Sequence, residues 1–178
     1  MVNKLKIFNN FNIPNKFKKS IILIGNFDGL HSGHQKLFEL AKKYKTKYKS
    51  KVGVVTFDPM PKMFFNTQIK NYRISNFNQK VIYLKKFGVD FVINKKFDKN
   101  FSKINYHKFI KDILSRKLKS KFIFVSNNFR FGHKREGDVS QLKKYENDFG
   151  YNLINPAPLI KNKKIISSTV IRKLLEEG

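Results

Sequence analysis

Cysteine is absent from the 178 residues of the chain. Its absence excludes disulfide bonds, thiolate catalysis and cysteine-based zinc sites, and it is typical of an intracellular protein. Long apolar runs are missing too, because no segment approaches the roughly 20 apolar residues that a membrane-spanning helix needs. The first residues, Met1 to Lys6, are not followed by the apolar core of a secretion signal. We therefore expect a soluble, cytoplasmic protein that does not insert into membranes.

Acidic residues are scarce: 12 Asp and Glu stand against 38 Lys and Arg, which gives a formal net charge of +26. Such a charge attracts polyanions, so nucleic acid and anionic membrane are the partners to consider. The lysines are scattered along the chain, as in Lys42-Lys43 and Lys143-Lys144, with no arginine-rich arm and no repeated basic-aromatic module. This distribution favours a solvated lysine-rich surface without a specific nucleic-acid or membrane partner. The field would still help to recruit anionic nucleotides.

Apolar runs rich in β-branched residues alternate with amphipathic helical stretches, which is typical of a parallel sheet with crossover helices. The chain has no Pro/Gly/Ser-rich linker and no internal repeat, so we expect a single domain over residues 1–178. Asn76 and Gln79 predict a capping box for one helix, and Gly88 predicts its end. The predicted strands are Ser20 to Ile24, Val52 to Phe57, Phe91 to Ile93, Phe122 to Ser126 and Tyr151 to Ile154. The predicted helices are Gln35 to Lys47, Phe77 to Phe87, Tyr106 to Leu118, Ser140 to Phe149 and Ser168 to Glu177.

The segment Gly25 to His34 reads G-N-F-D-G-L-H-S-G-H and joins the first predicted strand to the first predicted helix. A strand that leads through such a turn into a helix aims the helix's free backbone N–H groups and its positive dipole end at one point, where a phosphate is favoured. Gly33 lacks a Cβ, so a nucleotide could approach its backbone closely. Gly25 and Gly29 suit the positive φ angles of a tight turn. The pattern predicts an anion site.

His31 and His34 are three residues apart, so their imidazoles share one face if a helix begins here. Imidazole donates hydrogen bonds in either charge state and, when protonated, adds positive charge where a transferring phosphate becomes more negative. Two alternatives are a pair of turn histidines without chemistry and half of a zinc site. The strand, glycine and helix context favours a phosphate site over the first, and H-x-x-H lacks an evident third and fourth ligand for the second.

Near the end of the chain, Ile166 to Arg172 read I-S-S-T-V-I-R. Hydroxyl side chains at a helix start are ordinary N-caps. An arginine in the first turn, beside those hydroxyls and N–H groups, would make a clamp for a phosphate or pyrophosphate. Ligands of an open parallel sheet bind beyond the carboxyl ends of its strands. The segments Asp58 to Pro61 and Asn127 to Gly132, which follow the second and fourth predicted strands, should therefore join the same site.

These blocks together resemble the nucleotidyltransferase superfamily of the H-x-G-H and I-S-S-T-x-x-R type. More narrowly, the chain is similar to the FMN adenylyltransferase module of bacterial bifunctional riboflavin kinase/FAD synthetase. The motifs that carry the narrower resemblance are G-N-F-D-G-L-H-S-G-H, T-F-D-P-M-P (Thr56 to Pro61), N-F-R-F-G (Asn128 to Gly132) with Arg135 and Gly137, and I-S-S-T-V-I-R with Leu175 and Gly178. The resemblance implies a doubly wound, Rossmann-like α/β fold.

The resemblance also implies a reaction, in which the FMN phosphate attacks the α-phosphorus of ATP in line to give FAD and pyrophosphate. Because that phosphate is already an anion, the protein has only to align it and stabilise charge on the leaving group. Mg²⁺ would bridge phosphate oxygens and keep its waters, so no protein cage of ligands is expected. The implied catalytic residues are His31, His34, Asn128 and Arg172. The implied ATP-binding residues are Gly25, Asn26, Phe27, Gly33, Ser167, Ser168 and Thr169, and the implied flavin-binding residues are Pro59, Pro61, Phe65 and Phe131.

Three departures from the family pattern qualify these expectations. Met60 stands where the family commonly has histidine, and Ser126 where it commonly has glycine, which bears on flavin affinity and loop geometry. The bifunctional enzymes continue into a riboflavin kinase barrel beyond the position of Gly178, so we expect adenylyltransferase activity without kinase activity. The alternatives are an H-x-G-H nucleotidyltransferase with another phosphate acceptor and a basic nucleic-acid-binding protein with an inactive site. For Phe65 and Phe131 the alternative is core packing, and Asp28 either orients the turn or touches substrate.

Overall fold

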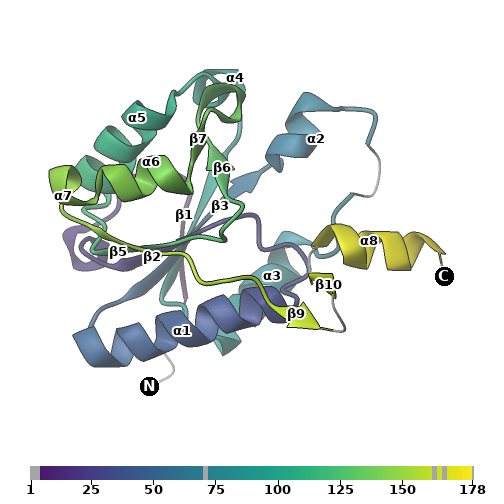
Figure 1. The fold of residues 1–178 in the computed structure, drawn as a ribbon, viewed down its shortest axis with the longest axis horizontal. Helices are drawn as coiled ribbons and strands as arrows, with labels where there is room; N and C mark the ends of the chain where they lie inside the picture. The colour runs from purple at the N-terminus through teal and green to yellow at the C-terminus, as the bar shows by residue number, and fades with distance from the viewer. Residues whose placement is uncertain (1–4, 70–71, 162–163, 166–167, 178) are drawn as a thin grey trace.

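A six-stranded parallel sheet forms the centre of the protein, as the computed structural model shows (Figure 1). The structure describes residues 5–69, 72–161, 164–165 and 168–177. The strand order is β1-β4-β3-β2-β5-β8, and every neighbouring pair is parallel. The strands are β1 (Lys6–Phe8), β2 (Ile21–Ile24), β3 (Val52–Asp58), β4 (Phe91–Lys96), β5 (Phe122–Phe124) and β8 (Asn152–Ile154).

The chain runs outward from β2 through β3 to β4, then returns to the other side of β2 to add β5 and β8. The direction of winding therefore reverses between β2 and β5, and this reversal defines a doubly wound sheet with its ligand crevice at the switch point. The predicted α/β fold is confirmed. The five predicted strands are all present, with shifted ends, and β1 is an edge strand that the sequence pattern did not reveal.

Helices cover both faces of the sheet. The longest are α1 (Ser32–Tyr48), α3 (Phe77–Lys86), the π-helical η2 (Phe109–Lys117) and α8 (Ser168–Glu177). The shorter ones are η1 (Asn15–Phe17), α2 (Pro61–Phe65), α4 (Lys99–Ser102), α5 (Tyr106–Lys108), η3 (His133–Arg135), α6 (Val139–Lys144) and α7 (Glu146–Phe149). Two small hairpins pair β6 (Arg130–Phe131) with β7 (Gly137–Asp138), and β9 (Ile160–Lys161) with β10 (Lys164–Ile165).

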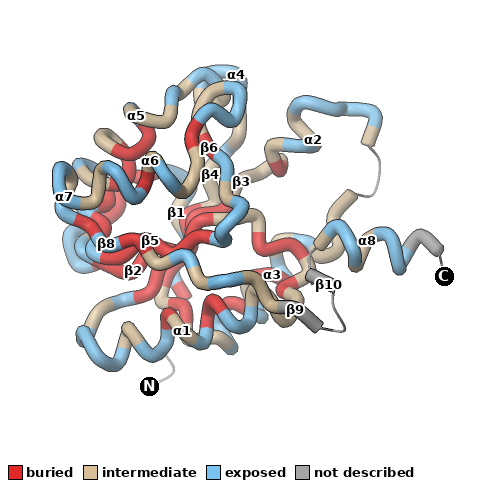
Figure 2. The backbone as a smooth tube through the Cα atoms, in the orientation of Figure 1, coloured by how far each residue is buried: buried red, intermediate tan, exposed pale blue. Residues whose placement is uncertain are grey.

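Successive side chains of each central strand enter different cores, because neighbouring residues of a strand point to opposite faces. Ile21 and Leu23 of β2 pack in a cluster with residues of α1 and α3, whereas Ile22 and Ile24 pack with residues of η2 and α6. The strands form the buried centre of the molecule in Figure 2. Burial on both faces explains why these strands read as continuous apolar runs and not as alternating ones.

Several helix boundaries differ from those predicted. α1 begins at Ser32 and not at Gln35, because His31 is its N-cap and accepts a hydrogen bond from the His34 N–H. The predicted helix Tyr106 to Leu118 is a short α-helix followed by a π-helix, and the predicted helix Ser140 to Phe149 is two helices that meet at Tyr145. The capping box of Asn76 and Gln79 is confirmed, and Gly88 has a positive φ of 77° just after α3.

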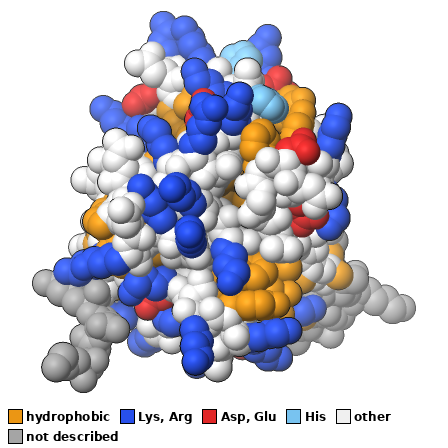
Figure 3. Space-filling model, turned by 90° about the vertical axis from the view of Figure 1, so that its left-hand side faces the viewer, with side chains coloured by type: hydrophobic (Ala, Val, Ile, Leu, Met, Phe, Trp, Pro, Cys, Tyr) orange, Lys and Arg blue, Asp and Glu red, His pale blue; other side chains and the backbone are white. Residues whose placement is uncertain are grey.

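Lys and Arg side chains are spread among polar and apolar ones over the face shown in Figure 3. They do not form a single continuous stripe there. Among the residues that the structure describes, none of the helices combines the length and the apolar character needed to cross a bilayer.

Candidate active site

The turn between β2 and α1 lies at the carboxyl edge of the sheet, beside the switch point. Its backbone has positive φ at Phe27 (47°), Gly29 (74°) and Leu30 (38°), so the expectation of such an angle is confirmed for Gly29 and wrong for Gly25. A Cβ on Gly29 would lie 2.9 Å from a methyl carbon of Ile74. Glycine is therefore required at position 29 both for conformation and for the close approach of a neighbouring segment.

His31 and His34 stack on each other at the start of α1, with ring centroids 3.7 Å apart and an interplanar angle of 23°. Phe27 packs edge-on against His34 at 5.2 Å. Burial, followed by the charge of His31, lowers the pKa of His34 to about 3, although Asp28 opposes the shift, and burial also lowers the pKa of His31. Both imidazoles are therefore neutral at pH 7, and a neutral imidazole can donate a hydrogen bond without adding a full positive charge.

Asp28 connects the histidine turn to the C-terminal helix. Its side chain is buried, and it accepts hydrogen bonds from the backbone N–H groups of Ile74 and Ser75, each at 3.0 Å, and from Arg172 Nη2 at 2.7 Å. Burial alone would raise the pKa of Asp28, but the bonds from Ile74, Arg172 and Ser75 outweigh it and hold that pKa below its usual value. Asp28 thus ties the turn to the segment 74–75 and to Arg172, and it lines the cleft as a paired carboxylate.

Arg172 and Ser168 hold the start of α8 against this turn. Arg172 Nε donates to the carbonyl oxygen of Tyr72 at 2.8 Å, and its guanidinium carbon lies 3.9 Å from the centroid of the Tyr72 ring. Ser168 Oγ donates to the carbonyl oxygen of Asp28 at 2.9 Å. Thr169 is exposed on the first turn of α8, and Ser167 lies outside the described residues.

A cleft at this edge of the sheet brings the two motifs together with the loops after β3 and β5. It has a volume of about 610 Å³. The predicted site residues that line it are Gly25, Asn26, Phe27, His34, Pro61, Phe65, Asn128, Ser168 and Arg172. A second hollow continues from it along the start of α1 and is lined by His31, Gly33, His34, Asn128 and the segment 156–159.

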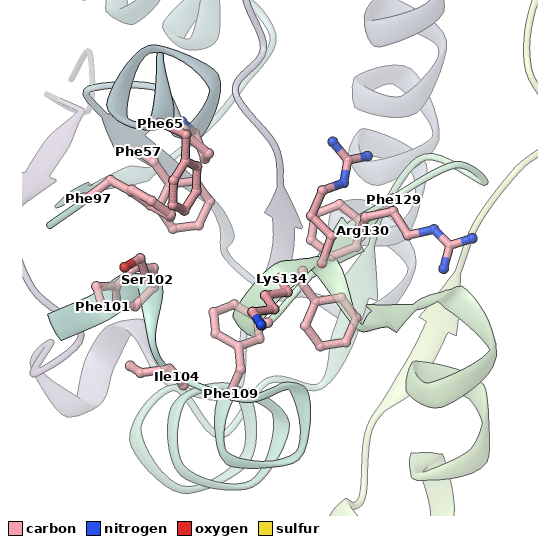
Figure 4. Close-up of a pocket in the computed structure, with 14 residues that line it drawn as sticks. Phe57, Phe65, Phe97, Phe101, Ser102, Ile104, Phe109, Phe129, Arg130 and Lys134 are labelled. Carbon is pink, nitrogen blue, oxygen red and sulfur yellow. The ribbon is translucent and has the colours of Figure 1, made fainter. Parts of the chain in front are cut away.

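An aromatic pocket opens from the other end of the cleft (Figure 4). Phe65 on α2 projects toward Phe57 and Phe97, and its side chain is 68% exposed, so core packing does not account for it. Phe131 is 8% exposed and stacks on Phe129 with ring centroids 5.4 Å apart. Phe131 therefore both packs in the core and lines the pocket. The lining residues are Phe57, Pro61, Phe65, Phe97, Phe101, Ser102, Ile104, Phe109, Phe129, Arg130, Phe131, Gly132, Lys134 and Arg135.

Sequence reasoning missed most of this pocket. Phe97 and Phe101 follow β4, whose end was not among the strand ends predicted to join the site. Three cations at the pocket, Arg130, Lys134 and Arg135, were also not singled out for binding. Of the predicted flavin residues, Pro61 lines both the pocket and the cleft, whereas Pro59 follows Asp58 through a cis peptide bond and is not among the residues that line either hollow.

The two positions that depart from the family pattern both lie at the cleft. Met60 is buried and lines the cleft beside the N-terminus of α2, and Ser126 lines it after β5. In the described part of the chain, no group of three or more His, Asp or Glu side chains could hold a metal ion.

The parallel sheet, the histidine pair at a helix N-terminus and the crevice at the switch point define a doubly wound, Rossmann-like α/β protein. Residues 13–170 match the FAD synthetase family. The chain belongs to that family.

Known relatives agree with this assignment. The chain is 41% identical over 167 residues to the bifunctional riboflavin kinase/FMN adenylyltransferase of Buchnera aphidicola from Acyrthosiphon pisum, covering 94% of this chain and 53% of that protein. It is 34% identical over 157 residues to the protein of the same name from Escherichia coli K12, covering 88% of this chain and 50% of that protein. The chain thus spans about half the length of these relatives.

A solved structure shares the fold. The crystal structure named as a macrolide-efflux protein from Streptococcus pneumoniae superimposes with a TM-score of 0.80 and 27% sequence identity. The match covers 94% of this chain and 54% of that one. It bears on the fold of the chain, and the name describes the other protein alone.

Proposed function

We propose that this chain transfers AMP from ATP to the phosphate of FMN, giving FAD and pyrophosphate. One observation carries the proposal: the cleft adjoins the hollow beside His31 and His34 at one end and a pocket walled by phenylalanines at the other. A nucleotide phosphate suits the first end, because free N–H groups and the helix dipole favour anions there. A flat apolar ring suits the second end. The relatives' name, FMN adenylyltransferase, fits this pairing of ligands.

On the ATP side, we assign His31 and His34 as neutral donors that stabilise charge on the α-phosphate as it is transferred. Gly25, Asn26, Phe27 and Gly33 present backbone to the nucleotide at the cleft and the adjoining hollow. No activated side-chain nucleophile is required, since the attacking FMN phosphate is itself an anion.

At the other end of the triphosphate, we assign Arg172 together with Ser167, Ser168 and Thr169. Arg172 uses Nε and Nη2 to hold α8, and it still lines the cleft. A guanidinium carries five N–H donors, so donors remain for phosphate oxygens while the helix is anchored.

On the flavin side, Pro61, Phe65 and Phe131 would enclose the isoalloxazine ring, and Pro59 would shape the loop behind them. Asn128 lines both the cleft and the hollow beside His31, so its amide would lie between the two substrates and could orient the reacting phosphate. Arg130 and Arg135 line both the cleft and the aromatic pocket, where their charges would favour the flavin phosphate.

Mg²⁺ fits this site as a partner of the nucleotide and not as a resident ion, because the described residues offer no cluster of ligands for it. When bound with ATP, the ion would neutralise charge on the phosphate oxygens. The protein residues would then position both substrates and exclude water.

The test is to supply the purified chain with ATP, Mg²⁺ and one acceptor at a time: FMN, pantetheine phosphate or nicotinate mononucleotide. We expect FAD and pyrophosphate with FMN and no adenylylated product with the others. Product formed from another acceptor but not from FMN would retain the reaction class and overturn the choice of substrate. Absence of pyrophosphate in all three mixtures would overturn the proposed function.

A further inference from the structure

A buried lysine lies behind the proposed active site. Lys80 on α3 is 6% exposed, although it carries an ammonium group that is normally placed in water. Its Nζ donates a hydrogen bond to Thr56 Oγ1 at 3.3 Å, and Thr56, on β3, is completely buried. Burying a charge is costly, so this position demands an explanation beyond packing.

The lysine is connected through Thr56 to the turn between β2 and α1, which carries the histidines. Thr56 Oγ1 in turn donates to the carbonyl oxygen of Asn26 at 3.4 Å. The two hydrogen bonds form a directed chain from the ammonium group to the backbone of the segment that precedes the histidines, and the charged donor strengthens the chain. Movement of the Lys80 side chain would therefore alter the turn that presents backbone to ATP.

The charged groups around Lys80 come from several elements. Asp28 in the histidine turn is paired with Arg172, and Asp58 at the end of β3 is paired with Arg73. Both carboxylates influence the titration of Lys80, as does Arg73, and Lys80 in turn influences His34 on α1. Each carboxylate thus already has an arginine partner, and the ammonium group adds a positive charge that this cluster does not neutralise.

The small cavity beside Lys80 lies next to the cleft. Asp28, Phe57 and Met60 line both spaces, so a single layer of residues separates the ammonium group from the proposed substrates. Charges act over longer range in a buried, weakly polarisable surrounding than they do in water. The surplus positive charge therefore acts on the anions that would bind in the cleft.

We propose that Lys80 is a positioning residue of the adenylyl-transfer site. It fixes the turn between β2 and α1 through Thr56, and it supplies the uncompensated positive charge behind the bound triphosphate. This inference rests on the proposed function. It makes Lys80 different from the other lysines of α3, whose charges face solvent.

The test compares Lys80→Met with Lys85→Met, which removes the same charge from an exposed position of the same helix. We expect kcat/KM for ATP in FAD formation to fall on the order of 10²-fold in Lys80→Met, the usual scale for losing one preorganised donor. Lys85→Met should match the unaltered chain. Equal rates in both variants, or an equal loss in both, would overturn the proposal.

A pH profile separates this role from simple packing. Burial is the largest of the effects that lower the pKa of Lys80 to about 8; Asp28 opposes the shift by raising this pKa, and Arg73 adds to it by lowering this pKa. The unaltered chain should therefore lose activity above about pH 8, Lys80→Met should show no such decline, and Lys80→Arg should retain activity above that pH. Thr56→Val keeps the charge and breaks the chain of hydrogen bonds, so it should lower the rate while keeping the decline. A decline that persists unchanged in Lys80→Met would overturn the proposal.

Thermal unfolding and ATP binding complete the design. Lys80→Met should unfold at the same or a higher temperature, because it removes a buried charge while retaining the apolar stem. A large loss of stability that accounts for the loss of activity would make Lys80 merely structural and would overturn the proposal. Calorimetric titration with Mg·ATP, without FMN, should show about tenfold weaker binding in Lys80→Met than in Lys85→Met. This titration distinguishes the two proposals, because the absence of FAD formation in the unaltered chain would overturn the function and leave the binding comparison intact.

Discussion

The two ends of the cleft are built in different ways. The histidine turn is held by a buried carboxylate, a helix cap and backbone hydrogen bonds, and its groups are largely fixed before any ligand arrives. The aromatic pocket is formed by side chains from several separate elements, among them β3, α2, α4, η2 and β6, and its residue Phe65 on α2 is mostly exposed. Preorganised polar groups serve charge stabilisation, whereas apolar walls serve affinity for a ring. Changes at the first end should affect turnover and folding, and changes at the second should affect flavin saturation.

The largest effect is expected from His34→Ala, which removes a neutral donor from the polar end. We expect kcat for FAD formation to fall by about 10²–10³-fold with little change in KM for FMN. His107→Ala is the control, because that ring packs against Tyr145 and Phe149 away from the cleft. Steady-state assays at saturating ATP measure both, and near-normal turnover in His34→Ala would contradict the assigned role.

Asp28→Asn tests whether the polar end is held together by its buried ion pair. Arg172 would keep a largely buried charge without its partner, and we expect a loss of about 3 kcal/mol in the free energy of unfolding. The matched change Asp112→Asn breaks the surface pair with Arg116 and should cost at most about 0.5 kcal/mol. Denaturant titration gives both values, and similar losses would show that the buried pair contributes nothing special.

The pH dependence of stability sharpens the same contrast. The folded-state pKa of His34 is about 3, below its unfolded value of 6.5, so the unfolded chain binds more protons between these pH values. Stability should therefore rise with pH across that window, and His34 alone should make the protein about 2 kcal/mol less stable at pH 5 than at pH 7. Denaturant titrations at the two pH values measure the difference. The part of this stability difference that is lost in His34→Gln is due to the titration of His34. A difference that is unchanged in His34→Gln would contradict the prediction.

The smallest effect is expected at the aromatic end. Phe65→Ala should raise KM for FMN about fivefold, near 1 kcal/mol of lost ring contact, while KM for ATP and the unfolding temperature stay unchanged. Tyr83→Ala removes a comparably exposed aromatic ring from α3 and should change neither KM. An increase in KM for ATP in Phe65→Ala would show that the two ends are not separate.

The sequence was most informative where local chemistry decides the structure. The apolar runs predicted five strands of the central sheet, because that signal depends on residues close together in the chain. The strand, the glycine-bracketed turn and the following helical pattern put the histidines beside a helix start, although the predicted first residue, Gln35, is three positions later than the observed one. β1 was not predicted because Lys6–Phe8 is a short, largely exposed edge strand with little apolar signal. The break between α6 and α7 at Tyr145 was not predicted from the sequence either.

The candidate site was predictable in its motifs and not in their contacts. Arg172 was expected at a phosphate, and the structure pairs it with Asp28, which lies 144 positions away in the sequence. The phenylalanines that line the pocket could not be predicted, because the chain has 19 phenylalanines and the sequence does not distinguish those that line a pocket from those that pack in the core. The proposed role of Lys80 depends on its burial, and the sequence does not distinguish a buried lysine from the exposed lysines of the same helix.

The cap on α1 has a consequence for proton placement. Because Nδ1 of His31 accepts the His34 N–H, it cannot also carry a hydrogen, and the neutral ring must hold its proton on Nε2. The beginning of the helix thereby selects the tautomer of the first histidine. Because His31 is the N-cap of α1, folding alone fixes Nε2–H as the hydrogen-bond donor of this ring.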